Sequence, residues 1–187
     1  MFTEDLRVSC VRTAVLKVRL LALGLCLPAV LLSGSVLAQD ATVPADIQAA
    51  IFKKVFAYVR TLSPASPPPI LILYDDASTK SMDEIRKAFE QLRIDAVGVK
   101  EADLANRIRD GSTVVYVATP RGSFRQIFQK TRSLSITGLP LLVQRGDASI
   151  GLALEESKPK ILVNMSELKA EGHEVASNLL QLAQLIQ

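Results

Sequence analysis

From residue 70 onward, short apolar runs alternate with amphipathic segments, and this alternation restricts the fold more than any other feature of the sequence. The four apolar runs cover residues 70–74, 94–99, 113–118 and 139–143. Continuous apolar runs of this length are typical of strands that are covered on both faces. The segments between them have the apolar spacing of helices. This strand–helix order predicts a parallel sheet flanked by helices.

Two of the predicted helices begin at candidate capping boxes. Ser81 with Glu84 opens the helix after the first strand, and Ser123 with Gln126 opens the helix after the third strand. In such a box each side chain satisfies a backbone N–H group of the first helical turn. A shorter helix over residues 102–109 is expected between the second and third strands.

The pattern changes near the C-terminus. Residues 149–154 and 160–163 are two short strand-like runs close together, which predicts a hairpin at one edge of the sheet. Asn164 is expected to cap the next helix, and a last helix is expected to reach the chain end through Val175, Leu179, Leu182 and Ile186. The predicted fold class is therefore α/β with three layers: a mostly parallel sheet with helices on both faces, and a C-terminal β-hairpin plus helices.

An amphipathic helix is predicted over residues 46–62. Phe52, Phe56 and Val59 belong to an apolar arc that covers about half of its circumference. Such an arc needs to be buried, either on the chain's own sheet or against a partner, and these three residues are the candidate partner-binding surface. The proline-rich stretch 63–69 follows as a stiff linker.

Residues 1–38 have the pattern of a secretory signal peptide. Basic residues precede an apolar run over 20–32, and small residues then lead to Ala38 as the expected cleavage point. A signal anchor is the alternative, but the run is short for a membrane span. We therefore expect a periplasmic protein with no stable membrane span after cleavage. The predicted parts are a signal peptide (1–38), an N-terminal helix and linker (39–69) and the remainder of a single α/β domain (70–187).

The expected mature chain offers little for catalysis. Cys10 and Cys26 lie in the leader, and His173, the only histidine, stands beside Gly172 at a helix break, where we expect it to be solvated. A transition-metal site therefore lacks ligands, and we expect no enzyme, no metal and no cofactor. Without the leader the chain has 18 basic and 17 acidic residues, a balance that gives no electrostatic footprint for nucleic acid.

Polar residues follow several of the predicted strands at their carboxyl ends, where open α/β sheets bind ligands. A pair of adjacent aspartates there suits a cation or an amine, and an arginine at a helix start suits an anion. Polar turns and helix caps are the alternative interpretation. The candidate ligand crevice consists of Asp75, Asp76, Ser78, Arg121, Ser123 and Gln144.

Several stretches of the chain resemble the YfiR-like family of small periplasmic bacterial proteins. They are GDASIGL at 146–152, ILVNM at 161–165, LKAEG at 168–172, ASNLLQLA at 176–183 and the first helix at 47–56. The resemblance implies a compact α/β domain that binds another protein and has no assigned catalytic residues. The best-known member restrains a membrane diguanylate cyclase by contacting its periplasmic portion. The cysteine pairs of the family are missing here, so redox sensing is not carried over to this chain.

Two functional hypotheses follow from these observations. In the first, the protein is a non-enzymatic regulator or adaptor that binds the periplasmic part of an inner-membrane signalling protein. A diguanylate cyclase and a sensor kinase are the candidate partners, and a homodimer is a further candidate assembly. In the second, the protein binds a small periplasmic solute in the crevice, and such a ligand would raise the midpoint of thermal unfolding.

Overall fold

The computed structural model describes residues 42–62, 68–109 and 113–186. The predicted signal peptide and most of the proline-rich linker lie outside the described residues. The described residues belong to one compact unit, which contains a seven-stranded sheet in the order β2-β1-β3-β4-β5-β6-β7. The strands are β1 (Ile70–Tyr74), β2 (Ala96–Lys100), β3 (Val114–Val117), β4 (Leu134–Thr137), β5 (Ile150–Glu155), β6 (Lys158–Asn164) and β7 (Ala183–Ile186).

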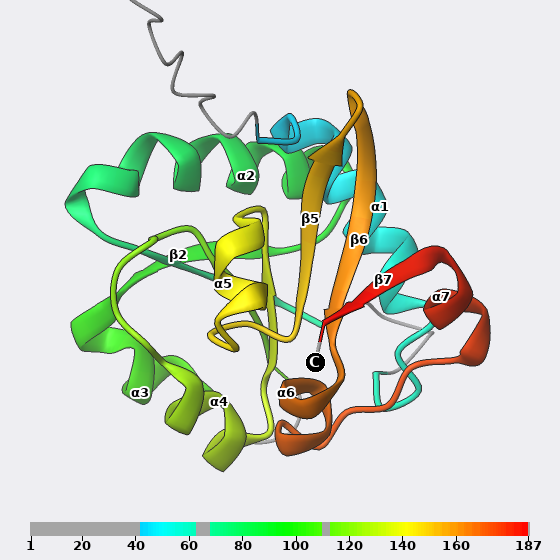
Figure 1. Ribbon diagram of the computed structural model, residues 1–187. Helices are drawn as coiled ribbons and strands as arrows, with labels where there is room; N and C mark the ends of the chain where they lie inside the picture. Colours follow the sequence, from blue (N-terminus) through cyan, green and yellow to red (C-terminus); the bar gives the residue numbers. More distant parts are fainter. Residues whose placement is uncertain (1–41, 63–67, 110–112, 187) are drawn as a thin grey trace, which may run out of the picture. The chain divides into compact units, whose positions relative to one another are not determined.

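The first five strands in this order run parallel, as the strand–helix alternation predicts. β5 and β6 form an antiparallel hairpin in which Leu152 pairs with Ile161, and β7 then pairs parallel to β6. Figure 1 shows this hairpin as the long orange pair of strands beside the red β7. The predicted α/β fold class, with its C-terminal hairpin and helices, is therefore confirmed.

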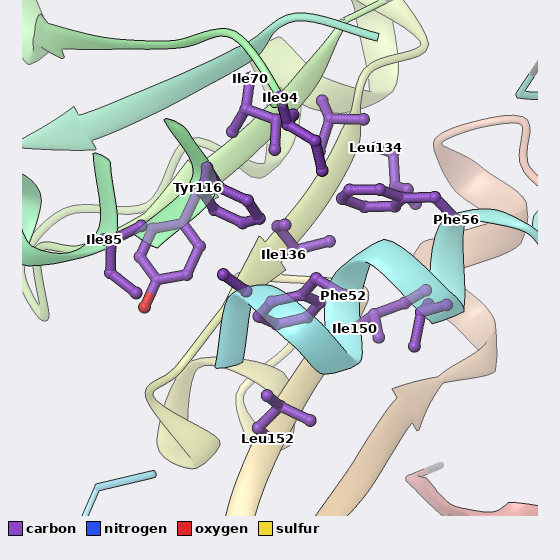
Figure 2. Packing of buried hydrophobic residues seen from close by; sticks show 14 of the residues in the cluster. Phe52, Phe56, Ile70, Ile85, Ile94, Tyr116, Leu134, Ile136, Ile150 and Leu152 are labelled. Atoms are coloured by element: carbon purple, nitrogen blue, oxygen red, sulfur yellow. The ribbon is translucent and has the colours of Figure 1, made fainter. Parts of the chain in front are cut away.

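One face of the sheet is covered by α1 (Ala45–Phe56) and α2 (Thr79–Gln91). Phe52 lies at the centre of this core, with its ring edge-on to Tyr116 at a centroid distance of 6.1 Å and stacked on Phe56 at 6.5 Å. Figure 2 shows these rings packed over Ile136 and Ile150 of the sheet. The arc predicted on the first helix is thus buried on the chain's own sheet.

The other face is covered by α3 (Leu104–Arg107), α4 (Arg125–Thr131) and α5 (Pro140–Gln144). Leu104, Phe128 and Leu142 from these helices pack on Leu73 and Val117 of the sheet. Because β1 and β3 are buried from both sides, their sequences are continuously apolar. This is the property by which they were predicted.

The fourth strand was predicted at residues 139–143, and that prediction is wrong. The strand is β4, Leu134–Thr137, and the apolar run after it is the helix α5. Pro140 occupies the start of this helix, where its fixed φ is favourable and no N–H group is needed. β4 was not predicted because Ser135 and Thr137 interrupt the continuous apolar run by which the other strands were identified, although both side chains are buried and hydrogen-bonded.

Two predicted helices are shorter than the sequence suggested. The first helix was predicted to reach residue 62, but α1 ends at Phe56, and Val59 then forms a β-bridge with Val175. The last helix was predicted to reach the chain end. Instead α7 (Ser177–Leu182) is followed by β7, which pairs its backbone with β6. In both places hydrogen bonds between distant segments replace further helical turns.

Two of the three predicted helix caps are wrong. α2 begins at Thr79, and the box at its approach is formed by Asp75 and Ser78 rather than by Ser81 and Glu84. α4 begins without a side-chain cap, so the box predicted at Ser123 is wrong. The third prediction is confirmed: the Asn164 side chain accepts a hydrogen bond from the Glu167 backbone at the start of α6 (Met165–Ala170).

None of the helices in the described part of the chain is both long and apolar enough to cross a bilayer. Within the same residues, no group of three or more histidine, cysteine, aspartate or glutamate side chains is placed to share a metal ion.

Candidate partner-binding groove

The three residues predicted as a partner surface lie in the core. Phe52, Phe56 and Val59 are 0%, 6% and 2% exposed. Their side chains fill the space between α1 and the sheet, where an amphipathic helix buries its broader apolar face (Figure 2). This corrects the prediction: a partner that meets the folded chain has no access to them.

An apolar groove lies on the outer side of α1 instead. It has a volume of about 500 Å³ and is formed by α1, the start of β6 and α7. Ligand-binding clefts in proteins span roughly 300–1,000 Å³, so the groove is large enough to hold several side chains of a partner. Its lining residues are Ile51, Lys54, Val55, Ala57, Tyr58, Pro159, Ile161, Leu179 and Leu182.

Helical spacing explains why these residues gather. Ile51, Lys54 and Tyr58 are three, four and seven positions apart, so they follow one side of α1 and the turn after it. Leu179 and Leu182 are three apart on α7. Leu182 is 69% exposed and Tyr58 is 37% exposed, which is a large apolar exposure for neighbours on one surface. Exposed apolar residues that cluster in this way mark sites of interaction.

Backbone pairing holds the two helical walls of the groove together. The Arg60 N–H donates to the Glu174 carbonyl at 2.8 Å, and the Ala176 N–H donates to the Tyr58 carbonyl at 2.9 Å. His173, which was expected to be solvated, is buried here, with its Nδ1 2.6 Å from Thr61 Oγ1. Burial lowers the pKa of His173, so its neutral form is favoured in the folded protein.

Lys54 is the charged residue among the lining side chains, and it makes no ion pair with the described residues. Two cations near the groove are already paired: Arg60 lies 4.0 Å from Glu174, and Lys160 lies 2.5 Å from Glu155. The groove therefore presents one unneutralised positive charge beside an apolar floor. It complements a segment that carries apolar side chains and a carboxylate.

The predicted ligand crevice is assembled only in part. Asp75, Ser78 and Arg121 do come together where β1 and β3 end, at the point where the strand order reverses. Asp75 accepts hydrogen bonds from Ser78 and from Thr119, and Arg121 lies 3.4 Å from the same carboxylate. The hydrogen bonds from Ser78 are the main cause that lowers the pKa of Asp75. These groups satisfy one another and act as a helix cap.

The other crevice residues lie outside this cluster. Asp76 pairs with Lys100 at 2.8 Å on the exposed side of the sheet edge. Ser123 is exposed and makes no side-chain hydrogen bond with the described residues. Gln144 was expected at the carboxyl end of a strand over residues 139–143. The chain instead forms the helix α5 there, which ends at Gln144 and leads back towards the amino end of β5. The crevice as predicted is therefore not a single site.

A small cavity does open beside the ends of β3 and β4, but its volume is about 130 Å³. That is room for a few water molecules, below the range of pockets that hold a metabolite. Its wall contains a buried relay in which the Tyr116 hydroxyl donates to Gln48 Oε1 at 2.7 Å and Gln48 Nε2 donates to the Val43 carbonyl at 2.6 Å.

This relay gives a first testable prediction. A Cβ atom at Gly138 would overlap the amide group of Gln48, so Gly138→Ala is expected to displace Gln48 and leave the Tyr116 hydroxyl without its acceptor. The expected loss in the free energy of unfolding is about 1–3 kcal/mol, measured by urea denaturation. In a Gln48→Ala background the same substitution should cost much less. An equal cost in both backgrounds would contradict this explanation.

Sequence inspection missed a second buried polar group, around Glu171 of the turn that ends α6. Glu171 is 2% exposed, and both of its carboxylate oxygens accept hydrogen bonds from Ser135 and Ser149. Burial is the main cause that raises the pKa of Glu171 to about 7. Glu167, one turn earlier, is also buried and pairs with Arg125. The signal in the sequence was limited to two acids four residues apart, Glu167 and Glu171, at the predicted helix that Asn164 caps.

Comparison with known proteins agrees with this architecture. The sequence profile of a family described as YfiR/HmsC-like matches residues 45–184, which extends from the first residue of α1 into β7. No curated protein matches the sequence.

Two solved structures show related folds. One is described as an ABC domain in complex with L-Trp from Streptococcus pneumoniae, with a TM-score of 0.55 and 11% identity over 77% of this chain and 60% of that chain. The other is a conserved domain protein from Vibrio cholerae, with a TM-score of 0.56 and 14% identity over 79% of this chain and 61% of that chain. The chain thus spans about three fifths of each, and at these identities the likeness shows the α/β fold alone.

Proposed function

Because this chain belongs to the YfiR/HmsC-like family, we propose that it is a periplasmic regulator of cyclic-di-GMP signalling that acts by binding an inner-membrane signalling protein. The partner of this proposal is a diguanylate cyclase with a periplasmic portion. The chain occupies that portion and so lowers the output of the cyclase. The regulator itself performs no chemistry.

The single observation that supports binding rather than solute capture is the contrast between the two hollows. The apolar groove of about 500 Å³ has exposed Tyr58 and Leu182 on its rim. The cavity at the carboxyl edge of the sheet has about 130 Å³, and the polar groups predicted there already satisfy one another. Apolar surface gains free energy when a partner covers it, at roughly 25 cal/mol per Å².

The occupant that fits the groove is a short amphipathic segment of the partner. Its apolar side chains would pack between α1 and α7, and a carboxylate would pair with Lys54 at the side of α1. Tyrosine is one of the residue types that carry a large share of the binding free energy at interfaces, so Tyr58 is the expected anchor for the partner. The proposal therefore predicts that a charge at Tyr58 abolishes regulation.

The test is made in the source cells after deletion of the gene, with cyclic-di-GMP measured at equal periplasmic amounts of each variant. The original chain is expected to restore a low cyclic-di-GMP level, and Tyr58→Asp is expected to behave like the deletion. Val97→Asp is the matched control, because Val97 is 49% exposed on β2, at the opposite edge of the sheet. It should behave like the original chain.

Two outcomes count against the proposal. If deletion leaves the cyclic-di-GMP level unchanged, the regulatory role is wrong. If Tyr58→Asp and Val97→Asp both restore the low level, the groove is not the binding surface. A charge reversal at Lys54→Glu is expected to weaken regulation by roughly tenfold or less, because the ion pair lies at a solvated rim.

A further inference from the structure

Ser135, Ser149 and Glu171 form a buried group that we term the Glu171 cluster. Ser135 lies on β4, Ser149 directly precedes β5, and Glu171 follows α6, so the cluster joins three elements. The three side chains are 0%, 0% and 2% exposed. A buried polar group of this kind is stable only if each donor and acceptor has a partner.

With Glu171 ionised, the cluster satisfies this requirement. The Ser135 hydroxyl donates to Oε1, the Ser149 hydroxyl donates to Oε2 at 2.7 Å, and the Ser135 N–H donates to Oε2 at 3.1 Å. The Ser149 N–H donates to Ser135 Oγ at 2.8 Å. The carboxylate thus accepts three hydrogen bonds, although it stays unpaired by any cation in these contacts.

With Glu171 protonated, the same atoms are satisfied again after two hydroxyl rotations. The carboxylic acid donates from Oε1 to Ser135 Oγ. The Ser135 hydroxyl then turns to Ser149 Oγ at 3.2 Å, and the Ser149 hydroxyl turns to the Ser135 carbonyl at 2.9 Å. Since hydroxyl groups both donate and accept, every buried polar group of the cluster has a hydrogen-bond partner in either form of Glu171.

Charged groups around the cluster disfavour the ionised form. Burial is the main cause that raises the pKa of Glu171, and the like charge of Glu167 on α6 raises it further, while Arg125 of α4 is already paired with Glu167. The side chain of Arg132, from the turn after α4, packs against Gly172. The groups that contact the carboxylate from β4 and from the residue before β5 are the neutral Ser135 and Ser149. The ionised carboxylate is therefore buried without a cation of its own, which is unfavourable.

The Glu171 cluster is the last attachment before the segment that forms the far wall of the groove. Gly172 follows at φ +80°, and the His173 N–H donates to the Leu168 carbonyl at 2.9 Å. Val175 then bridges to Val59, Leu179 enters the core, and β7 pairs with β6. Residues 172–186 are thus attached through the cluster that directly precedes them, through the backbone pairing of residues 58–60 with residues 174–176, and through β7 on β6.

We infer that protonation of the Glu171 cluster controls how firmly residues 172–186 are held. In mildly acidic surroundings the neutral cluster keeps this segment closed on the sheet. In alkaline surroundings the buried charge makes local opening of α7 and β7 more frequent, and the groove loses its α7 wall for part of the time. This inference concerns the chain alone and does not depend on which partner occupies the groove.

Amide hydrogen exchange tests this inference on the purified protein. Protection factors are compared at pH 5.5 and pH 8, for amides of residues 176–186 and for reference amides in β1 and β3. Relative to Glu171→Gln, which cannot ionise, the protection of residues 176–186 in the original chain is expected to fall by about tenfold or more at pH 8, since one pKa unit corresponds to a tenfold change in population. At both pH values it should stay below the protection of β1 and β3, because residues 176–186 open without unfolding of the whole domain.

Two further variants test whether the pH dependence originates at the Glu171 cluster. Glu156→Gln, on the exposed turn between β5 and β6, should retain the original pH dependence. Ser149→Ala removes a donor to the ionised form and should move the loss of protection to higher pH. His173 also titrates near this segment, but it is present in every variant. An unchanged pH dependence in Glu171→Gln, or protection of residues 176–186 equal to that of β1 and β3 at both pH values, would overturn the inference.

Discussion

Replacement of Phe52 by alanine is expected to lower the free energy of unfolding by about 3–5 kcal/mol. The Phe52 side chain is fully buried and contacts two aromatic neighbours, with Tyr116 edge-on and Phe56 stacked (Figure 2). Truncation leaves a cavity between α1 and the sheet that rigid strands cannot collapse to fill. Urea denaturation followed by circular dichroism measures the loss. Because small domains are stable by only about 5–15 kcal/mol, a large fraction of the protein would unfold on warming.

Ile47→Ala provides the control on the same helix. Ile47 is 39% exposed, so its truncation should change the free energy of unfolding by about 1 kcal/mol or less. The difference between the losses in the two variants distinguishes the buried side of α1 from its exposed side. If Phe52→Ala were as stable as the original protein and lost only partner binding, Phe52 would be an interface residue and the packing described here would be incorrect.

The second large effect is a pH dependence of stability that originates at Glu171. Its pKa is about 7 in the folded protein against 4.5 for the free side chain. The folded state therefore holds its proton more tightly than the unfolded state. The stabilisation is fully present below pH 4.5 and is lost as the pH rises through 7. The expected loss in the free energy of unfolding is about 3 kcal/mol over this window.

Comparison with Glu171→Gln isolates this contribution. The free energy of unfolding of both proteins is measured in urea at several pH values from 5 to 8. Over this range the original protein should lose about 2–3 kcal/mol of stability relative to Glu171→Gln. His173 contributes with the opposite sign, because its lowered pKa stabilises the fold at higher pH, but it cancels in the difference. A difference that stays constant from pH 5 to 8 would refute the role assigned to Glu171.

Elements with strong local signals were predicted correctly from the sequence. β1 and β3 are continuously apolar because both of their faces are covered, and α2 has one apolar stripe because only one of its sides meets the sheet. The Asn164 cap was predicted correctly because β6 ends at Asn164 and α6 begins at the next residue. In these cases the cause of the structure lies within a few residues of chain.

The failures concern elements whose stability comes from distant parts of the chain. β4 contains Ser135 and Thr137, whose burial depends on partners that the sequence does not place beside them: Glu171 and the Val117 carbonyl. β7 has the apolar content of a helix end and becomes a strand only because β6 offers an unpaired edge. The sequence likewise identified the apolar arc of α1 but not which side of that helix would remain exposed.

The same distinction applies to the candidate site. Phe52, Phe56 and Val59 were selected because they are large and apolar, which is also the property that places them in the core. The groove is formed by Tyr58, Ile161 and Leu182, from three elements that meet only in the folded chain. No local pattern connects these residues, so the groove could be found only in three dimensions.

In the proposed function, the folded surface between α1 and α7 binds an inner-membrane signalling protein. The most direct test of this binding is photo-crosslinking in intact cells, with a photoreactive amino acid at position 58 or at position 97. We expect position 58 to crosslink to a membrane protein that carries a diguanylate cyclase domain, and position 97 to give no such product. Crosslinks of that protein at position 97, or its absence at position 58 while the variant still lowers cyclic-di-GMP, would contradict the account.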